Sequence, residues 1–386
     1  MGPRQAWYSD LLTLPNLCII GVMTHVLLTN TFPPDLKNIW NEEFAIKLAD
    51  AQGALGGLNE AVSLLHNPNL LMRPLLDKEA ESSTRLEGTQ ASVEDVYKSE
   101  FIENPDKKDD VAEVVNYQKA LVHGYETIKE RPLNQFLIKQ LHKTLMSGVR
   151  GDSKSPGKYR KDDVWIGEDG TDLGDARYVP PSAFHVQGLM DNLFKLINDE
   201  TIHPVIGAGL IHYQFEAIHP FKDGNGRTGR LLITLYLLKR KALRAPLLYP
   251  SGYFEKNRKN YVDALHSVDI SQDWESWLGY FTEGIKTQAK LSLIVARDID
   301  GLFKKHRDKV KNESAHLGLL QLLEYCFIQP YVTVSLIVSR LDIPSNTVRR
   351  YLDTLEEHGI IEHIDTHSRG QKIYANLELL SILRKI

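Results

Sequence analysis

Apolar residues recur at spacings of three and four along most of this chain, and this helical periodicity constrains its fold more than any other feature. Strand patterns are confined to short hairpins. The sequence therefore predicts a mainly α protein, and 386 residues with 42% hydrophobic side chains suffice for two or three domains. The helical pattern is clearest at Phe44–Leu65, Asp110–Ile128, Pro132–Met146, Ser182–Asn198, Pro204–Ile218, Arg227–Lys241 and Trp274–Phe303.

A stretch of twelve residues between two of these predicted helices is rich in groups that bind phosphate. It reads His-Pro-Phe-Lys-Asp-Gly-Asn-Gly-Arg-Thr-Gly-Arg, from His219 to Arg230. Gly224 and Gly226 permit a tight turn whose amide groups point inward, and the N-terminus of the next helix adds partial positive charge. Arg227 and Arg230 lie three residues apart, so they project from one face of that helix. The sequence therefore predicts a polyphosphate site.

The same stretch holds two groups that suit chemistry on a phosphate. Asp223 supplies a hard oxygen ligand of the kind that suits Mg2+ when it bridges phosphate oxygens. His219 is the one group here whose ordinary pKa lies near neutrality, so it can take a proton from an incoming hydroxyl. We expect an active site rather than a helix cap, because a solvated Gly-Asn-Gly turn would leave these two side chains and both arginines unexplained.

Gly224, Gly226 and Gly229 also satisfy the Gly-x-Gly-x-x-Gly pattern of dinucleotide-binding folds. That fingerprint needs an apolar strand before the first glycine and an acidic residue about twenty residues further on. Here residues 206–218 have helical spacing, and Leu243–Ala245 stand where the acid should be. The context therefore excludes a dinucleotide fold.

The stretch resembles the signature of the Fic family of AMP transferases, His-Pro-Phe-x-(Asp/Glu)-Gly-Asn-Gly-Arg-x-x-Arg, and every fixed position matches. The implied reaction is attack of a protein Tyr, Ser or Thr hydroxyl on the alpha phosphate of ATP, which leaves AMP on the target and releases pyrophosphate. The implied partners are ATP and a target protein. The implied site residues are His219 as the catalytic base, Phe221 as the loop anchor, Asp223 as the Mg2+ ligand, Asn225 with the Gly224 and Gly226 amides at the alpha and beta phosphates, and Arg227 and Arg230 on the polyphosphate.

Ser83, Glu87 and Gly88 match a second motif, [Ser/Thr]-x-x-x-Glu-[Gly/Asn]. It resembles the inhibitory helix that some Fic proteins carry before the catalytic core. The resemblance implies that Glu87 pairs with Arg230 and occupies the guanidinium that should hold the gamma phosphate of ATP. Gly88 is suited to end that helix, and a capping box at Ser92 begins the next one.

A hairpin pattern lies between the two motifs. Val164, Trp165 and Ile166, together with a second run at 177–181, flank a polar turn at 168–175. In the Fic family the corresponding flap clamps the target segment by strand addition, so the resemblance implies that role here. An ordinary surface hairpin is the alternative.

Asn257 and Tyr261 lie four residues apart on a predicted helix. They resemble residues that border the adenine in Fic relatives. A helical tyrosine is more often part of the core, so the residues alone leave both interpretations open.

The pattern changes after about Asn312, and the new order resembles a winged helix-turn-helix domain. The predicted elements are helices at Leu317–Phe327 and Val334–Leu341, a turn at Ile343–Pro344, a third helix capped by Ser345 and running to His358, and strands at Ile360–Ile364 and Lys372–Ala375. Such a domain can read DNA through Asn346, Thr347, Arg349 and Arg350. From Ala315 to Ile386, however, seven Lys or Arg accompany eight Asp or Glu, so DNA binding is not favoured over a protein partner.

These patterns divide the chain into five predicted regions: an extension at 1–40, a helical region with the inhibitory motif at 41–109, a Fic catalytic core at 110–290, a helical linker at 291–312 and a winged-helix domain at 313–386. Leu11–Thr29 is apolar, but Pro15 and His25 interrupt it, so we expect a packed extension rather than a signal peptide or membrane span. Cys18 and Cys326 form no disulfide framework or metal motif, which favours a cytoplasmic protein.

The sequence therefore predicts a Fic-type helical bundle with a β-hairpin flap and a C-terminal winged helix. Its expected function is Mg2+-dependent AMP transfer from ATP to a target protein and to itself, restrained by Glu87, with no membrane partner. A homo-oligomer is left open. One alternative is removal of AMP or transfer of another phosphate-linked group. The other is a DNA-binding regulator, which the net charge of −4 disfavours.

Overall fold

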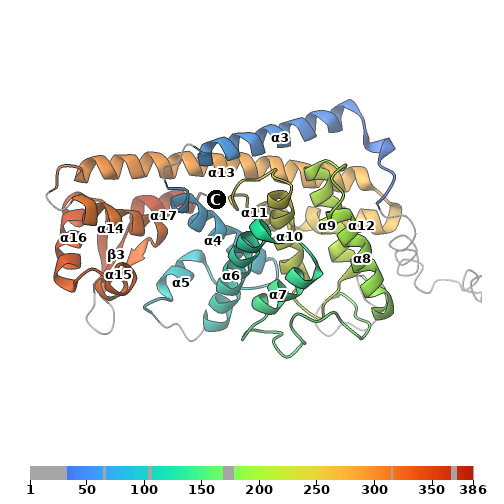
Figure 1. Cartoon of the computed structure of the whole chain (residues 1–386), viewed down its shortest axis with the longest axis horizontal. Helices are drawn as coiled ribbons and strands as arrows, with labels where there is room; N and C mark the ends of the chain where they lie inside the picture. Colours follow the sequence, from blue (N-terminus) through green and yellow to red (C-terminus); the bar gives the residue numbers. More distant parts are fainter. Residues whose placement is uncertain are drawn as a thin grey trace, which may run out of the picture.

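The computed structural model describes residues 33–63, 67–102, 107–167, 178–313, 316–366 and 372–385. Most of the predicted extension at 1–40, including Leu11–Thr29, lies outside the described residues. The described chain is mainly helical, as predicted, and its one sheet of three antiparallel strands lies near the C-terminus (Figure 1). Before the winged helix, its helices are α3 Glu42–Ser63, α4 Asn69–Arg85, α5 Val93–Lys98, α6 Lys108–Glu130, α7 Gln135–Leu145, α8 Val186–Ile197, α9 Pro204–Ile218, α10 Asn225–Lys239, α11 Ser251–Lys256, α12 Arg258–Ser271 and α13 Trp274–Val310.

Local chemistry explains why these helices begin and end where they do. α9 has the predicted bounds because Pro204 suits the first turn of a helix and has no N–H that needs an intrahelical partner. α7 begins later than predicted because the Asn134 side chain accepts a hydrogen bond from the Leu137 N–H at 3.0 Å and caps the helix there. The predicted capping box is confirmed at Ser92, whose side chain accepts from the Asp95 N–H at 3.2 Å.

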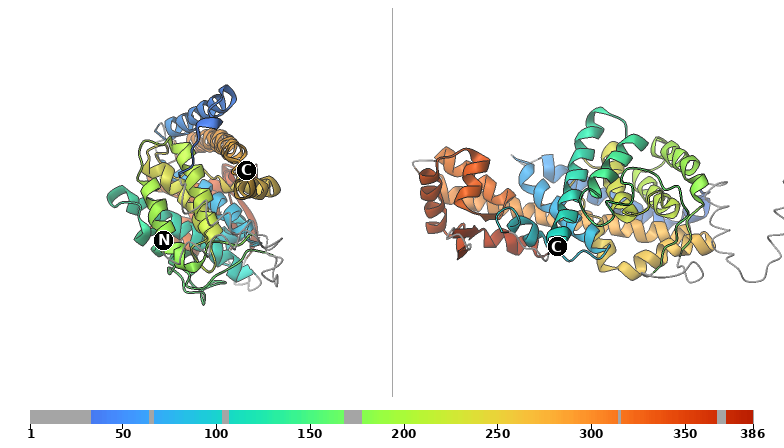
Figure 2. Two further views of the ribbon diagram at one scale, coloured as in Figure 1. Left: turned by 90° about the vertical axis from the view of Figure 1, so that its right-hand side faces the viewer. Right: turned by 90° about the horizontal axis from the view of Figure 1, so that it is seen from below.

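α13 is the longest helix of the described chain, with 37 residues. It extends beyond the predicted end at Phe303 and continues through most of the predicted linker at 291–312, to Val310. α3 packs along it, and Figures 1 and 2 show both helices running side by side. α13 thus links the larger helical body to the C-terminal region as one rigid element.

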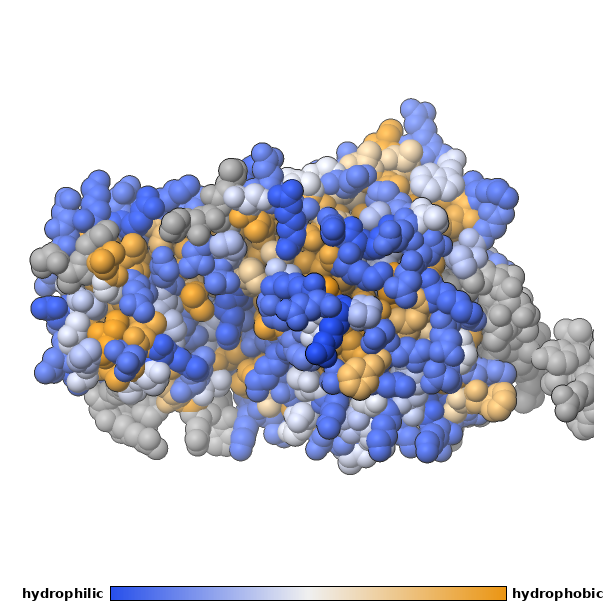
Figure 3. All heavy atoms as spheres, viewed as in Figure 1, coloured by the Kyte–Doolittle hydropathy of each residue, from blue (hydrophilic) through white to orange (hydrophobic). Residues whose placement is uncertain are grey.

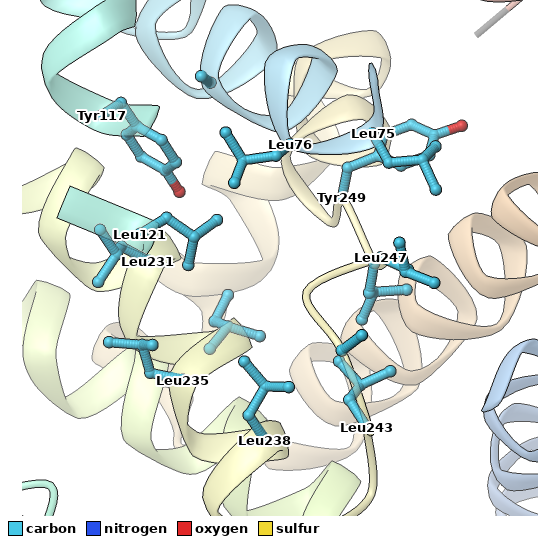
Figure 4. Packing of buried hydrophobic residues seen from close by; sticks show 14 of the residues in the cluster. Leu75, Leu76, Tyr117, Leu121, Leu231, Leu235, Leu238, Leu243, Leu247 and Tyr249 are labelled. Atoms are coloured by element: carbon cyan, nitrogen blue, oxygen red, sulfur yellow. The ribbon is translucent and has the colours of Figure 1, made fainter. Parts of the chain in front are cut away.

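The interior of the larger body is built from leucines on helices that are distant in sequence. α9 and α10 are buried on nearly every side, so their apolar residues show no single stripe. Burial of each leucine contributes about 1.5 to 3 kcal/mol to folding, so this cluster fixes α4 against α10. Figure 4 shows part of it, with Leu75 and Leu76 of α4, Tyr117 and Leu121 of α6, Leu231, Leu235 and Leu238 of α10, and Leu243, Leu247 and Tyr249 of the following segment.

The C-terminal region forms a winged helix-turn-helix. In the sheet the strand order is β1-β3-β2, with Val332 opposite Tyr374 and Glu362 opposite Ala375. The sequence did not predict β1 or α17. The predicted cap at Ser345 is wrong: α16 begins at Ser345, Pro344 occupies the cap position, and no side chain caps the helix. The elements are α14 His316–Ile328, β1 Tyr331–Val332, α15 Val334–Leu341, α16 Ser345–Glu357, β2 Glu362–Thr366, β3 Lys372–Ala375 and α17 Leu377–Leu383.

The winged helix packs against α4 and α5. Glu94 of α5 accepts hydrogen bonds from Arg384 at 2.7 Å and from the Tyr331 hydroxyl at 2.7 Å. The Gln329 amide donates to the backbone carbonyl of Tyr97 at 2.8 Å. The C-terminal region therefore contacts the segment that leads away from the predicted inhibitory motif.

The surface seen in Figure 3 is mainly hydrophilic, and hydrophobic residues appear in small separate groups. Among the residues that the structure describes, no helix combines the length and apolar character needed to cross a membrane.

Candidate active site

The loop between α9 and α10 has a left-handed backbone at both ends. His219 ends α9 with φ 49° and ψ 60°, and its N–H donates to the Phe215 carbonyl at 3.0 Å. Gly224 precedes α10 with φ 74°, a conformation that glycine adopts without steric cost. A histidine in this conformation is unusual, so the surrounding contacts must hold it there.

Phe221 and Asn225 close the loop. The Asn225 side chain accepts a hydrogen bond from the Phe221 N–H at 2.8 Å and donates to the Phe221 carbonyl at 2.9 Å. The Phe221 ring is fully buried, as the loop-anchor prediction requires. Both polar atoms of the Asn225 side chain are thus bonded to the loop itself. The backbone N–H groups of the loop, rather than this side chain, are the groups that can contact phosphate here.

His142 of α7 braces the same loop, although the sequence gave no reason to select it. Its ring stacks on Phe221 with centroids 3.7 Å apart. Its Nδ1 accepts from the Gly157 N–H at 2.8 Å, so Nε2 carries the hydrogen and donates to the Asp223 carbonyl at 2.8 Å. Burial lowers the pKa of His142 to about 4, which keeps this tautomer in place at neutral pH.

Burial also lowers the pKa of His219 to about 4, although the Glu216 carbonyl acts in the opposite direction. The expected titration near neutrality is therefore wrong for this conformation. The imidazole is neutral at pH 7 and has a lone pair available to accept a proton. His219 lines a cavity of about 250 Å³ together with Glu87 and Arg230.

Arg230 lies at this cavity and contacts two residues of the predicted inhibitory motif, Ser83 and Glu87. Its Nε donates to Ser83 Oγ at 2.9 Å, and Nη2 donates to the Ser83 carbonyl at 2.8 Å and to Glu87 Oε1 at 2.7 Å. Glu87 lies in the turn after α4 rather than inside the helix, and Gly88 follows with φ 98°. The structure thus brings together two motifs that are 143 residues apart.

The charges of this pair stabilise each other. Burial alone would raise the pKa of the Glu87 carboxyl, but Arg230 outweighs it through charge and hydrogen bonding and holds that pKa below its usual value. Arg227 and His219 act in the same direction. Glu87 is therefore ionised at neutral pH and occupies the Arg230 guanidinium.

Arg227 lies beside the loop, with Nη2 3.8 Å from Asp223 Oδ1, but not at the cavity. It is buried, and its Nη1 donates to Glu113 Oε2 at 3.0 Å. It is not among the residues that line the cavity. In this conformation Arg227 is therefore not placed to contact a polyphosphate in the cavity, whereas Arg230 lines the cavity.

Asp223 is half-buried at the turn of the loop. Its Oδ1 accepts from the Gly224 N–H at 2.7 Å, and its Oδ2 lies 3.2 Å from Lys154 Nζ. No group of three or more His, Cys, Asp or Glu side chains that would suit a metal ion occurs among the described residues. A single carboxylate is nevertheless compatible with Mg2+ that arrives on ATP, because this ion takes most of its ligands from phosphate and water.

The predicted adenine-side residues separate in the structure. Tyr261 lines the cavity, and its hydroxyl lies 2.8 Å from His212 Nε2. Asn257 lies between α11 and α12, donates to the Tyr253 carbonyl at 3.0 Å and does not line the cavity.

Two acidic residues outside both predicted motifs also line the cavity. Burial raises the pKa of Glu216 to about 7. Asp269 accepts a hydrogen bond from the Tyr213 hydroxyl at 2.7 Å. Glu216 lies three residues before His219, which is the one sequence signal that would have marked it. The remaining lining residues are Leu86, Ile166, Tyr178, Ala217, Gly226, Arg258, Val262, Leu265 and His266.

The flap is present as a single antiparallel bridge. The Ile166 N–H donates to the Tyr178 carbonyl at 2.8 Å, and the Tyr178 N–H donates to the Ile166 carbonyl at 3.1 Å. Trp165 is exposed, Val164 is half-buried, and the predicted turn at 168–175 lies outside the described residues. The Tyr178 hydroxyl donates to the Ala217 carbonyl at 2.9 Å, which fixes the flap beside the loop.

Three parts of the chain match known protein families. Residues 45–126 match the Fic/DOC family N-terminal domain, and residues 132–237, which contain the loop and Arg230, match the Fic/DOC family domain. The chain belongs to the Fic family. In this Fic protein the predicted inhibitory segment falls in the first match and the predicted catalytic motif in the second. Residues 329–365, which form most of the winged helix, match the IclR helix-turn-helix domain.

The Fic protein is similar to curated protein adenylyltransferases. It is 26% identical over 243 residues to protein adenylyltransferase Fic of Drosophila virilis, an alignment that covers 61% of this chain and 47% of that protein. It is 33% identical over 147 residues to a probable protein adenylyltransferase of Aquifex aeolicus, which covers 38% of this chain and 40% of the relative. This Fic protein thus spans less than half the length of these relatives.

Solved structures share the fold of this Fic protein. A Fic family protein from Desulfovibrio desulfuricans superimposes with a TM-score of 0.54 at 20% identity, covering 85% of this chain and 95% of that one. Fic-1 from Caenorhabditis elegans gives a TM-score of 0.51 at 18% identity and covers 78% of this chain and 86% of its own. These likenesses extend over most of the described helices.

Proposed function

We propose that this Fic protein transfers AMP from ATP to a hydroxyl group of a target protein, and to itself, and that Glu87 restrains the transfer. The observation that carries the proposal is the placement of a neutral His219 and the Arg230 guanidinium at one cavity, next to a loop whose amides begin a helix. The curated relatives named as protein adenylyltransferases support it.

His219 would act as the general base. Its neutral imidazole accepts the proton of the incoming hydroxyl, while the N–H groups at the start of α10 stabilise charge on the phosphate oxygens. Arg230, freed from Glu87, would bind the gamma phosphate and thereby align the alpha phosphate with the hydroxyl. AMP then bonds to the hydroxyl oxygen, and pyrophosphate leaves with the electrons of the broken P–O bond.

Asp223 would hold Mg2+ that enters with ATP. When bound, this ion neutralises charge on the phosphate oxygens. The Asp223 Oδ1 accepts from the Gly224 N–H at 2.7 Å and lies 3.8 Å from Arg227 Nη2. Its Oδ2 lies 3.2 Å from the exposed Lys154 side chain, which a cation would displace. We expect Asp223→Ala to weaken productive Mg-ATP binding.

The target would bind along the flap. Ile166 pairs with Tyr178 and also lines the cavity. A target segment added there as a strand would bring the hydroxyl of the target close to His219. A cytoplasmic location belongs to the same proposal, because two cysteines in 386 residues provide no disulfide framework of the kind that secreted proteins use.

The test measures labelled AMP incorporation with Mg-ATP for the wild type, Glu87→Gly and His219→Ala. We expect a slow wild type and a Glu87→Gly variant roughly ten- to a hundred-fold faster, since a charge-assisted pair is worth roughly 1.5 to 3 kcal/mol. His219→Ala in the Glu87→Gly background should abolish transfer. Equal rates for the wild type and Glu87→Gly would reject restraint by Glu87.

The same protein samples can distinguish AMP transfer from the alternative activity, removal of AMP. Incubation with an AMP-modified target distinguishes transfer from removal of AMP, because removal would release AMP and would depend on Glu87. A matched variant, Glu87→Gly with Arg230→Ala, should lose most of the gain, since the freed guanidinium is then absent. If the double variant stays as fast as Glu87→Gly, Arg230 does not hold the gamma phosphate.

A further inference from the structure

Arg160 connects the flap to the catalytic loop, and neither motif of the family includes it. The side chain is buried, with 3% of its surface exposed. Its guanidinium donates to the carbonyls of four residues: His219 at 2.9 Å, Ile218 at 3.3 Å, Asp162 at 3.2 Å and Pro181. Its own backbone N–H donates to the Pro220 carbonyl at 2.8 Å. A single residue therefore contacts three successive carbonyls at the end of α9 and both ends of the flap.

These contacts explain how His219 keeps its left-handed backbone. That conformation costs a non-glycine residue roughly 1 to 2 kcal/mol. The last carbonyls of a helix lack intrahelical partners, and a guanidinium at the C-terminus satisfies them and interacts favourably with the helix dipole. Arg160 supplies this cation at the point where α9 turns into the loop.

We infer that Arg160 is a positioning residue that holds the base His219 and the target-binding flap in one fixed relation. The inference rests on the proposed function for the roles of His219 and the flap. It accounts for a buried cation whose nearest described carboxylate, Asp163, lies 3.9 Å away and is mostly exposed. A planar fork with five donors reaches all four carbonyls, whereas a lysine ammonium cannot do so from one point.

The chain offers a matched control in Arg240. Its guanidinium also donates to backbone carbonyls, those of Asp199 at 3.1 Å, Glu200 at 3.0 Å and Ile202 at 3.0 Å. These carbonyls belong to the connection between α8 and α9, at the opposite end of α9 from His219. Removal of Arg240 should therefore leave backbone carbonyls without their guanidinium donor, as removal of Arg160 does, but without disturbing His219.

The experiment compares Arg160→Ala, Arg160→Lys and Arg240→Ala in the Glu87→Gly background. AMP incorporation is measured over a range of ATP concentrations, and thermal unfolding is measured for each protein. We expect Arg160→Ala to lower kcat roughly tenfold to a hundredfold with little change in KM for ATP, as misplacement of a reacting group does. Arg160→Lys should recover part of kcat, and Arg240→Ala should lower the melting temperature but leave kcat unchanged.

A readout that needs no activity completes the test. Hydrogen exchange of a peptide spanning 215–225 should accelerate in Arg160→Ala and stay unchanged in Arg240→Ala. An inactive Glu87→Gly protein would reject the proposed function, and the exchange data would still decide whether Arg160 holds the loop. Unchanged exchange, or equal loss of kcat in Arg160→Ala and Arg240→Ala, would overturn the inference.

Discussion

At the scale of single residues, the site contains side chains whose environments set their charge. Burial lowers the pKa of His219 to about 4 and raises that of Glu216 to about 7, although both lie at the same cavity. The same desolvation acts on both, because it always disfavours the charged form. For the proposed function, the consequences are a neutral His219 that can accept a proton and an ionised Glu87 that occupies Arg230.

The first prediction concerns the pH dependence of the Glu87→Gly variant. A depressed pKa means that His219, as the proposed base, becomes protonated and inactive only when the pH falls through about 4. Removal of Glu87 does not raise this value, because the Glu87 charge itself favours protonated His219. The rate kcat/KM, which reports the free enzyme, should therefore be nearly the same at pH 5.5 and pH 7.5.

A histidine with an ordinary pKa near 6.5 would instead be about 90% protonated at pH 5.5 and would lose most of its activity there. Circular dichroism at each pH provides the control for folding. A fall in kcat/KM centred near pH 6.5 would show that His219 is solvated when the enzyme works.

At the scale of elements, the features that could be predicted from the sequence are those set by neighbouring residues, such as helix bounds and helix caps. The periodicity predicted α9 with its observed bounds, and the cap at Ser92 was recognisable from two residues. The pairing of Glu87 with Arg230 was predictable only through the family motif, since the two lie 143 residues apart. Arg160 and His142 were not predictable, because their partners are backbone carbonyls and amides, which leave no pattern in a sequence.

The second prediction tests this distinction between caps. Ser92→Ala removes the hydroxyl that accepts from the Asp95 N–H in the capping box of α5, and it should cost about 1 kcal/mol of unfolding free energy. Ser345→Ala is the matched control, because Ser345 begins α16 without capping it and should change stability by less than about 0.5 kcal/mol. Denaturant unfolding of both variants measures the difference. Equal losses would mean that the Ser92 box adds nothing in solution.

At the scale of the whole molecule, α13 spans both regions. Trp277 is buried at its beginning, within the larger body, while Phe303 meets Phe327 of α14 near its end, with ring centroids 5.2 Å apart. The contacts of Glu94 with Arg384 and Tyr331 join the regions a second time. Two connections of this kind couple the stability of the winged helix to that of the Fic body.

The last prediction follows from this coupling. Phe303→Ala should destabilise the protein by about 3 to 5 kcal/mol, because it opens a cavity between α13 and α14. Ile294→Ala on the same helix is the control, because Ile294 is 54% exposed and should change stability by less than about 0.5 kcal/mol. Trp40, Trp165, Trp274 and Trp277 lie in the described part of the chain before α14, and no tryptophan occurs in residues 278–386, so fluorescence does not report the winged helix, whereas circular dichroism reports every helix. If the chain unfolds as one unit, both signals shift together in Phe303→Ala. A circular dichroism transition that precedes the fluorescence transition would show that the winged helix melts independently and that α13 does not transmit stability along its length.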